Sequence, residues 1–201
     1  MVTYNELIHA LRPYRGKLFT MFGHGSKNQF RYMRDLKGVI KDVLKSVPQG
    51  SAFLYYGDAP NKSKPDIGYA FQLISELRKD VDIYMIQVKK AEKYGVPSFV
   101  KAVYWHTDYT NECVWGGLHR GKPCSNTKKC VQIHKSIGIE RVFILGGGQI
   151  TLDEYSIMKK LGMNYDYYPI ERRYLGDGVT KVKDMDSKSK RVGVTYYKIK
   201  G

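Results

Sequence analysis

The sequence predicts an α/β fold with a mostly parallel central sheet and helices on both faces of that sheet. Three observations support this prediction. Short apolar runs typical of buried strands alternate with longer segments that have helical apolar spacing. Glycine-rich turns join some of these strands to the helices that follow them. Alternation at this spacing implies parallel strands with crossover helices between them.

The individual elements follow in order along the chain. Thr3 and Glu6 have capping-box spacing ahead of an apolar stretch, which predicts a short helix at the start. Buried strands are predicted at five apolar runs: 17–23, 51–58, 81–88, 98–105 and 141–145. Further helices are predicted at 30–47, 66–80, 126–138 and 151–162. Pro65 stands at the start of the second of these, and Gly162 closes the last.

The chain is expected to form a single domain. Its 201 residues suffice for one, and no linker or low-complexity tract divides residues 1–201. Within this domain, 165–201 is a basic C-terminal extension, with edge strands predicted at 164–170 and 192–200. The first residues lack the layout of a signal peptide, and no apolar run approaches the roughly 18 residues that span a bilayer. A soluble cytoplasmic protein is therefore expected.

The charge of the chain favours anionic partners. It holds 34 Lys+Arg against 19 Asp+Glu, a formal net charge of +15. Such a charge raises the local concentration of polyanions, so nucleic acid, nucleotides or an acidic partner are expected. The alternative is that the charge only maintains solubility, because the basic residues are spread along the whole chain.

Glycines mark a predicted ligand site. In open parallel sheets ligands bind at the carboxyl ends of the strands, where neighbouring crossovers diverge. Glycine lets the backbone approach a ligand closely, and a helix that starts there offers free N–H groups to an anion. The alternative is that the glycines only allow tight turns. Those at predicted strand ends are Gly23, Gly25, Gly57, Gly146, Gly147 and Gly148.

Three segments carry a resemblance to a known family. "FILGGGQITLDE" (143–154) resembles the "PGGxGTxxE" signature of the LOG phosphoribohydrolases and of the wider SLOG group of nucleotide-binding Rossmann-like domains. "LFTMFGHGSKNQF" (18–30) is similar to that family's first strand and turn. "LYYGDAPNKSKPDIGYAFQLI" (54–74) is similar to its second strand and helix, with a longer loop. The resemblance covers roughly Leu18 to Leu161.

The resemblance implies a pocket for a nucleoside 5′-monophosphate, whose N-glycosidic bond the protein would hydrolyse, or which it would sense without cleavage. Glu154 would be the catalytic carboxylate, assisted by Arg120. The residues expected at the nucleotide and its phosphate are Gly23, Gly25, Ser26, Gly57, Asp58, Gly147, Gly148, Gln149 and Thr151. A homodimer is also expected from the resemblance alone.

This chain departs from the family pattern at three points. Ile150 stands where the signature has its second glycine, and Gly146 stands where it has proline. The family's arginine segment ahead of the glycine strand has no counterpart, which leaves Arg120 or Arg141 as substitutes. Thr151 and Glu154 also have capping-box spacing, so the alternative role of Glu154 is to cap the following helix.

Cysteines and histidines form a second candidate site. Cys113, Cys124, Cys130 and His134 have a spacing whose second part resembles the end of a CCCH zinc finger, a family of RNA-binding modules. These four residues would hold a structural zinc ion. The alternative is packing, because Cys130 and His134 fall on one apolar face of a predicted helix. His106 and His119 are expected near the mouth of the nucleotide pocket.

Two functions from different classes follow. The first is a nucleotide-binding protein of the SLOG type, either a phosphoribohydrolase or a sensor. The alternative is a basic RNA-binding protein that uses the same fold as a scaffold, with the zinc-bound loop contacting RNA.

Overall fold

The computed structural model describes residues 2–25, 29–57, 65–106, 118–119, 122–123 and 125–170. The strand predicted at 192–200 and the part of the basic extension after residue 170 lie outside these ranges. In the described part of the chain, no helix has the length and apolar character that a membrane crossing needs.

The centre of the fold is a sheet of six parallel strands in the order β4-β3-β2-β1-β7-β8. Its members are β1 (Leu18–Gly23), β2 (Ala52–Tyr55), β3 (Asp82–Val88), β4 (Ala102–His106), β7 (Arg141–Leu145) and β8 (Tyr165–Tyr168). A separate antiparallel pair joins β5 (Leu118–His119) to β6 (Lys122–Pro123). The predicted α/β, Rossmann-like class is confirmed, and 164–170 does contain an edge strand.

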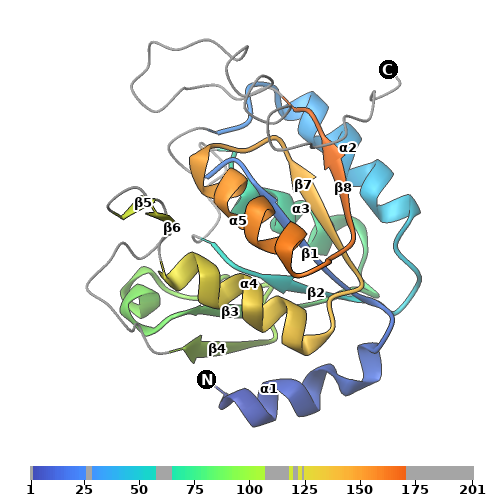
Figure 1. Ribbon diagram of the computed structural model, residues 1–201. Helices are drawn as coiled ribbons and strands as arrows, with labels where there is room; N and C mark the ends of the chain where they lie inside the picture. The colour runs from blue at the N-terminus through green and yellow to red at the C-terminus, as the bar shows by residue number, and fades with distance from the viewer. Residues whose placement is uncertain are drawn as a thin grey trace.

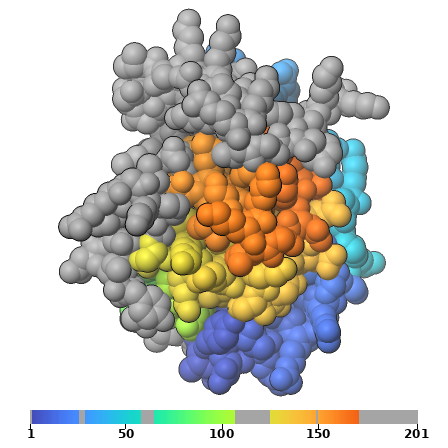
Figure 2. Space-filling view, viewed as in Figure 1, coloured from blue at the N-terminus to red at the C-terminus, as the bar shows by residue number. Residues whose placement is uncertain are grey.

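Among the described residues, five α-helices cover the two faces of this sheet. They are α1 (Tyr4–Leu11), α2 (Met33–Lys45), α3 (Ile67–Leu77), α4 (Ser125–Ile137) and α5 (Gln149–Lys160). Short 3₁₀ helices occupy η1 (Arg12–Tyr14) and η2 (Lys89–Tyr94). Figure 1 shows α4 and α5 in front of the sheet and α2 and α3 behind it. In the space-filling view, α1 lies below α4 and α5 on the front face (Figure 2).

The strands are buried on both faces, as expected of a parallel sheet covered by helices on each side. Behind the sheet, Phe19, Phe53 and Phe143 lie in one apolar cluster with the side chains of α2 and α3. In front, Leu18 and Leu54 pack with α1 and α4, while Val142 packs near α5. Both core layers bury continuous apolar surface, which is the main driving force for this fold.

The ends of the helices explain where several elements stop. At α1 the Thr3 hydroxyl accepts from the Glu6 N–H at 3.2 Å, and the Glu6 carboxylate accepts from the Thr3 N–H at 2.7 Å. The predicted capping box is therefore present. Asp66 caps α3 by accepting from the Tyr69 N–H, so Pro65 lies just before the cap. Gly162 follows α5 with φ +61°, as predicted for a closing glycine.

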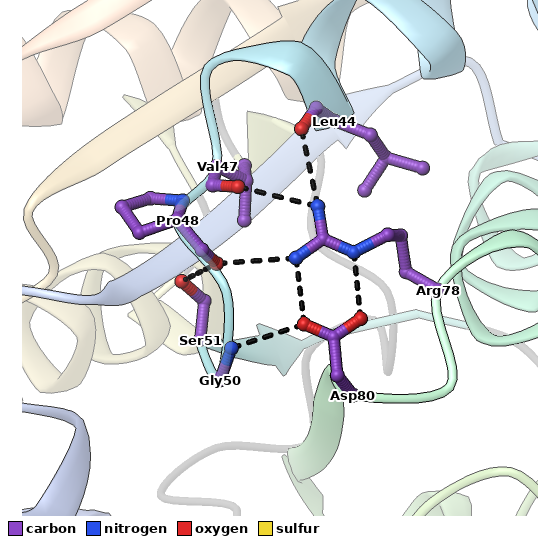
Figure 3. A network of polar contacts seen from close by, with 7 residues as sticks. All are labelled: Leu44, Val47, Pro48, Gly50, Ser51, Arg78 and Asp80. Carbon is purple, nitrogen blue, oxygen red and sulfur yellow. Dashed lines mark hydrogen bonds and ion pairs between the residues drawn. The ribbon is translucent and has the colours of Figure 1, made fainter.

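One polar network ties the end of α2 to the loop between α3 and β3 (Figure 3). The Arg78 guanidinium donates to both carboxylate oxygens of Asp80 at 2.7 Å and to the carbonyls of Leu44, Val47 and Pro48 at 3.3 Å. Asp80 also accepts from the Gly50 N–H at 3.0 Å. Hydrogen bonds from Arg78 and Gly50 hold the pKa of Asp80 well below its usual range. This network lies at the amino edge of the sheet, away from the glycine turns.

Candidate functional site

The strand order places a topological switch point between β1 and β7. From β1 the chain adds β2, β3 and β4 outward on one side, and α4 then returns it to β7 on the other side of β1. Crossovers on the two sides of β1 therefore diverge, and such a switch point is where open α/β sheets bind ligands. Gly23 ends β1 at this point, and Gly146 follows the end of β7. A Cβ atom on Gly23 would lie 2.6 Å from the Leu145 carbonyl oxygen, so glycine is needed there for the close approach of the two strands.

The turn at 146–148 takes a conformation that only glycine adopts easily. Gly146 has φ +58° and Gly147 has φ +127°. A Cβ on Gly146 would lie 2.4 Å from His24 Nε2, and one on Gly147 would lie 2.4 Å from Thr151 Cβ. The turn therefore packs tightly against neighbouring side chains, and its glycines have a structural role whatever the turn binds.

His24 packs against this glycine turn. Its side chain is buried, packs edge-on against the Phe30 ring, and joins three strand ends. Nδ1 accepts from the Gly147 N–H at 3.1 Å, and Nε2 lies 3.0 Å from the Ile170 carbonyl oxygen, to which it donates. These two bonds select the neutral tautomer with its proton on Nε2. Sequence reasoning missed His24, although its place between Gly23 and Gly25, directly after a strand, was the available signal.

Two of the three glycine amides are thus engaged by the protein itself. The Gly147 N–H bonds to His24, and the Gly146 N–H donates to the Tyr168 carbonyl at 2.8 Å. An anion at this corner would therefore meet the amides from Gly148 onward. Gly148 is the N-cap of α5, and no side-chain hydrogen bond caps this helix within the described ranges. The start of α5 is accordingly the part of the turn suited to an anion.

Thr151 and Glu154 do not form the capping box that their spacing suggests. The helix starts at Gln149, so Thr151 already lies inside its first turn. The Thr151 hydroxyl instead donates to the Gly23 carbonyl at 3.0 Å and joins α5 to the end of β1. The capping interpretation of Glu154 is therefore wrong, because the N-cap is Gly148, three residues before the Thr151 that the spacing implies.

Glu154 is a buried carboxyl group. It is 6% exposed, and its carboxyl group lies in the second turn of α5. Burial and the neighbouring Asp153 charge raise its pKa to about 8. Burial, with a contribution from Glu154, also raises the pKa of the Cys130 thiol, which places Glu154 near α4. A carboxyl group that stays protonated at neutral pH is able to donate a proton.

The adjoining face of α4 carries further buried polar groups. His134 Nδ1 donates to the Cys130 carbonyl at 2.7 Å, and its ring packs edge-on against Phe22. Burial lowers the pKa of His134 to about 4, so this ring is neutral. The Thr127 hydroxyl oxygen is buried and has no hydrogen-bond partner in the described part of the protein. Thr127 was not predicted, because one threonine in a polar segment gives no signal.

The zinc prediction is tested only in part. Cys130 and His134 lie together, with Sγ 3.5 Å from Nδ1, and both are buried among apolar side chains. No three metal-binding side chains gather anywhere among the residues that the structure places. Cys113 and Cys124 fall outside those residues, so zinc stays a prediction. Packing explains the positions of Cys130 and His134 without a metal.

The other predicted residues are distributed as follows. Gly57 has φ +157°, and its carbonyl accepts from Gln87 Nε2 at 3.2 Å at the ends of β2 and β3. His106 is buried at the end of β4. Arg141 begins β7 at the opposite, amino edge of the sheet, where it pairs with Asp166 at 2.9 Å, so the suggestion that it assists Glu154 is wrong. Ser26, Asp58 and Arg120 lie outside the described residues, as do the side chains of His119 and Gln149.

No protein-family model matches this chain, and none of the curated proteins does.

Proposed function

We propose that this protein binds a nucleoside 5′-monophosphate at the carboxyl edge of its sheet, between β1 and β7, and hydrolyses the N-glycosidic bond of that nucleotide. The phosphate would lie against the amides at the start of α5, from Gly148 onward. The sugar and base would extend toward α4. Support comes from the switch point, from the uncapped start of α5 and from the resemblance of 143–154 to the LOG signature.

Glu154 is the observation that carries this proposal. Burying a carboxyl group costs free energy, and the fold receives no helix cap in return. Enzymes raise the pKa of a glutamate in this way when it serves as a general acid near neutral pH. Perturbed groups also occur in structural networks, but Glu154 lies at the ligand-binding edge of this fold class.

In the proposed reaction the protonated Glu154 carboxyl donates its proton to the departing base, and the resulting carboxylate stabilises positive charge on the ribose ring. Water then adds its oxygen to the anomeric carbon and gives a proton to the Glu154 carboxylate, which restores the carboxyl group, so the products are free base and ribose 5-phosphate. Thr151 acts as a positioning residue, because its bond to the Gly23 carbonyl holds the start of α5 against β1.

The test is to incubate the full chain with each common nucleoside monophosphate, and to measure binding by calorimetry and free base by chromatography. Glu154→Gln has a similar volume and cannot ionise, so it should retain binding and lose at least about 100-fold in base release. If the native chain bound a mononucleotide but released no base, hydrolysis would be excluded and nucleotide sensing would remain as the function. No binding of any mononucleotide would contradict the proposal.

A further inference from the structure

The outer face of α2 carries regularly spaced basic residues. Its buried side packs on the sheet through Leu36, Val39, Ile40, Val43 and Leu44. On the opposite side, basic residues recur every three or four positions, which places them on one stripe. The members of this basic stripe are Arg34, Lys37, Lys41 and Lys45, all exposed.

The charges of the stripe are only partly compensated. Two acidic residues lie on one flank of α2: Asp42 pairs with Lys45 at 2.7 Å, and Asp35 lies 3.4 Å from Arg34. The side chains of Arg34 and Lys45 are nevertheless 93% and 78% exposed. Exposed pairs of this kind contribute little to stability, so the stripe is not explained as a stabilising network.

Gly38 provides a second and independent observation. It lies in the middle of α2, on the exposed side between Arg34 and Lys41. Its φ is not positive, and a Cβ atom there would meet nothing within 4 Å. The fold therefore does not require glycine at this position, although glycine inside a helix costs stability relative to alanine. What glycine does provide is bare backbone that another molecule can approach closely.

An exposed aromatic side chain adjoins the amino end of the stripe. Tyr32 is 46% exposed, and the Arg31 guanidinium lies 5.0 Å from the centre of its ring. Cations that follow a backbone, together with an exposed ring on which a base can stack, are the features that proteins use to bind single-stranded nucleic acid.

We propose that the outer face of α2, from Tyr32 to Lys45, binds the phosphodiester backbone of a single-stranded nucleic acid. The basic stripe contacts successive phosphates, Gly38 lets the strand approach the helix, and Tyr32 stacks on a base. This surface is separate from the proposed nucleotide pocket and does not depend on it: α2 covers the face of the sheet opposite α4 and α5 (Figure 1).

The first test compares two triple variants of the full chain by fluorescence anisotropy with a labelled single-stranded oligonucleotide, as RNA and as DNA, over a salt series. One variant carries Arg34→Gln, Lys37→Gln and Lys41→Gln. The control carries Lys128→Gln, Lys135→Gln and Lys159→Gln, which remove the same charge from exposed positions on α4 and α5.

The α2 variant should bind at least about tenfold more weakly, and its slope of log affinity against log salt should fall by about 2, because each single-strand phosphate contact contributes about 0.7. The control should change affinity less than about twofold. Equal losses in the two variants would show that only net charge matters and would overturn the proposal, as would the absence of binding at low salt. Binding of either RNA or DNA through α2 supports it.

The second test is Gly38→Ala. Alanine should raise the midpoint of thermal unfolding, because it favours the helix, and should weaken oligonucleotide binding severalfold, because its methyl group occupies the surface that the strand approaches. Stability and affinity are thus expected to change in opposite directions. An alanine variant that is more stable and binds equally well would overturn the role of Gly38.

Discussion

At the scale of single residues, Glu154 and His24 distinguish this site from an ordinary strand-to-helix turn. Glu154 is a buried carboxyl group without a capping role, and His24 uses both ring nitrogens to join three strand ends. The first is costly for the fold, whereas the second stabilises it. Their effects on stability should therefore differ in sign.

Glu154→Gln should stabilise the protein increasingly as pH rises. The pKa of Glu154 is raised from 4.5 to about 8, so the folded state keeps a proton that the unfolded state releases between these values. Wild-type stability consequently falls through this window and levels off above it, with an upper limit of about 5 kcal/mol. The thermal unfolding midpoint of the variant should exceed that of wild type more at about pH 8 than at about pH 5. The exposed Glu140→Gln is the control and should show no such trend. A difference in unfolding midpoint between Glu154→Gln and wild type that does not change with pH would contradict the raised pKa of Glu154.

Gly146→Ala should destabilise the protein by at least about 2 kcal/mol, as measured by urea unfolding. Its φ is +58°, and the added methyl group would overlap His24 Nε2 and the Ile170 carbonyl. Gly25→Ala is the matched control, because a Cβ there meets nothing within 4 Å. If both variants lost similar unfolding free energy, the tight packing described around Gly146 would be contradicted.

At the scale of elements, the connections between helices and strands carry the specific interactions. Thr151 joins the start of α5 to β1 at the carboxyl edge, and Arg78 joins the end of α2 to the loop before β3 at the amino edge. The two edges therefore have different roles. Interactions at the amino edge serve stability alone, whereas those at the carboxyl edge also lie where this class of sheet binds ligands.

Arg78→Lys should lower the unfolding free energy by about 1–2 kcal/mol. The folded variant should keep the activity of the native chain. Lysine cannot reproduce the paired bond to Asp80 together with the bonds to carbonyls at the end of α2. Lys79→Ala is the neighbouring control: its amino group makes an exposed bond to the Ser75 carbonyl, so its loss should cost less than about 0.5 kcal/mol. Equal effects in the two variants would argue against the network in Figure 3.

At the scale of the whole molecule, the sheet separates two surfaces of different chemistry. The proposed mononucleotide pocket lies at the carboxyl edge between β1 and β7, while the basic stripe runs along α2 on the back of the sheet. A pocket ligand held by short contacts should respond weakly to salt, whereas a strand bound by several phosphates should respond steeply.

The two surfaces should consequently respond to different substitutions. Glu154→Gln should leave oligonucleotide affinity within about twofold of wild type, and the α2 triple variant should leave mononucleotide affinity equally unchanged. Calorimetry with a mononucleotide and anisotropy with the oligonucleotide measure both quantities on the same preparations. If either variant reduced both affinities alike, the two surfaces would be one site.

Much of this architecture could be predicted from local patterns. The strands predicted at 17–23 and 141–145 are β1 and β7, and the glycines at their carboxyl ends lie at one edge as expected. The capping box of Thr3 and Glu6 could also be predicted, because a helix cap involves residues that are close in sequence. The start of α5 was misjudged, since Thr151 and Glu154 match a capping box, yet the Thr151 hydroxyl bonds instead to Gly23, which is 128 residues away.

By itself, therefore, the sequence determined the α/β class, the parallel strands and the edge on which the glycines gather, because periodicity and turn residues act over short stretches of chain. Only the tertiary structure decided the strand order, the contact of His24 with Gly147 and Ile170, and the burial of Glu154. These depend on segments distant in sequence that meet when the sheet assembles. The pKa of Glu154 is set by its surroundings, which no local pattern reveals.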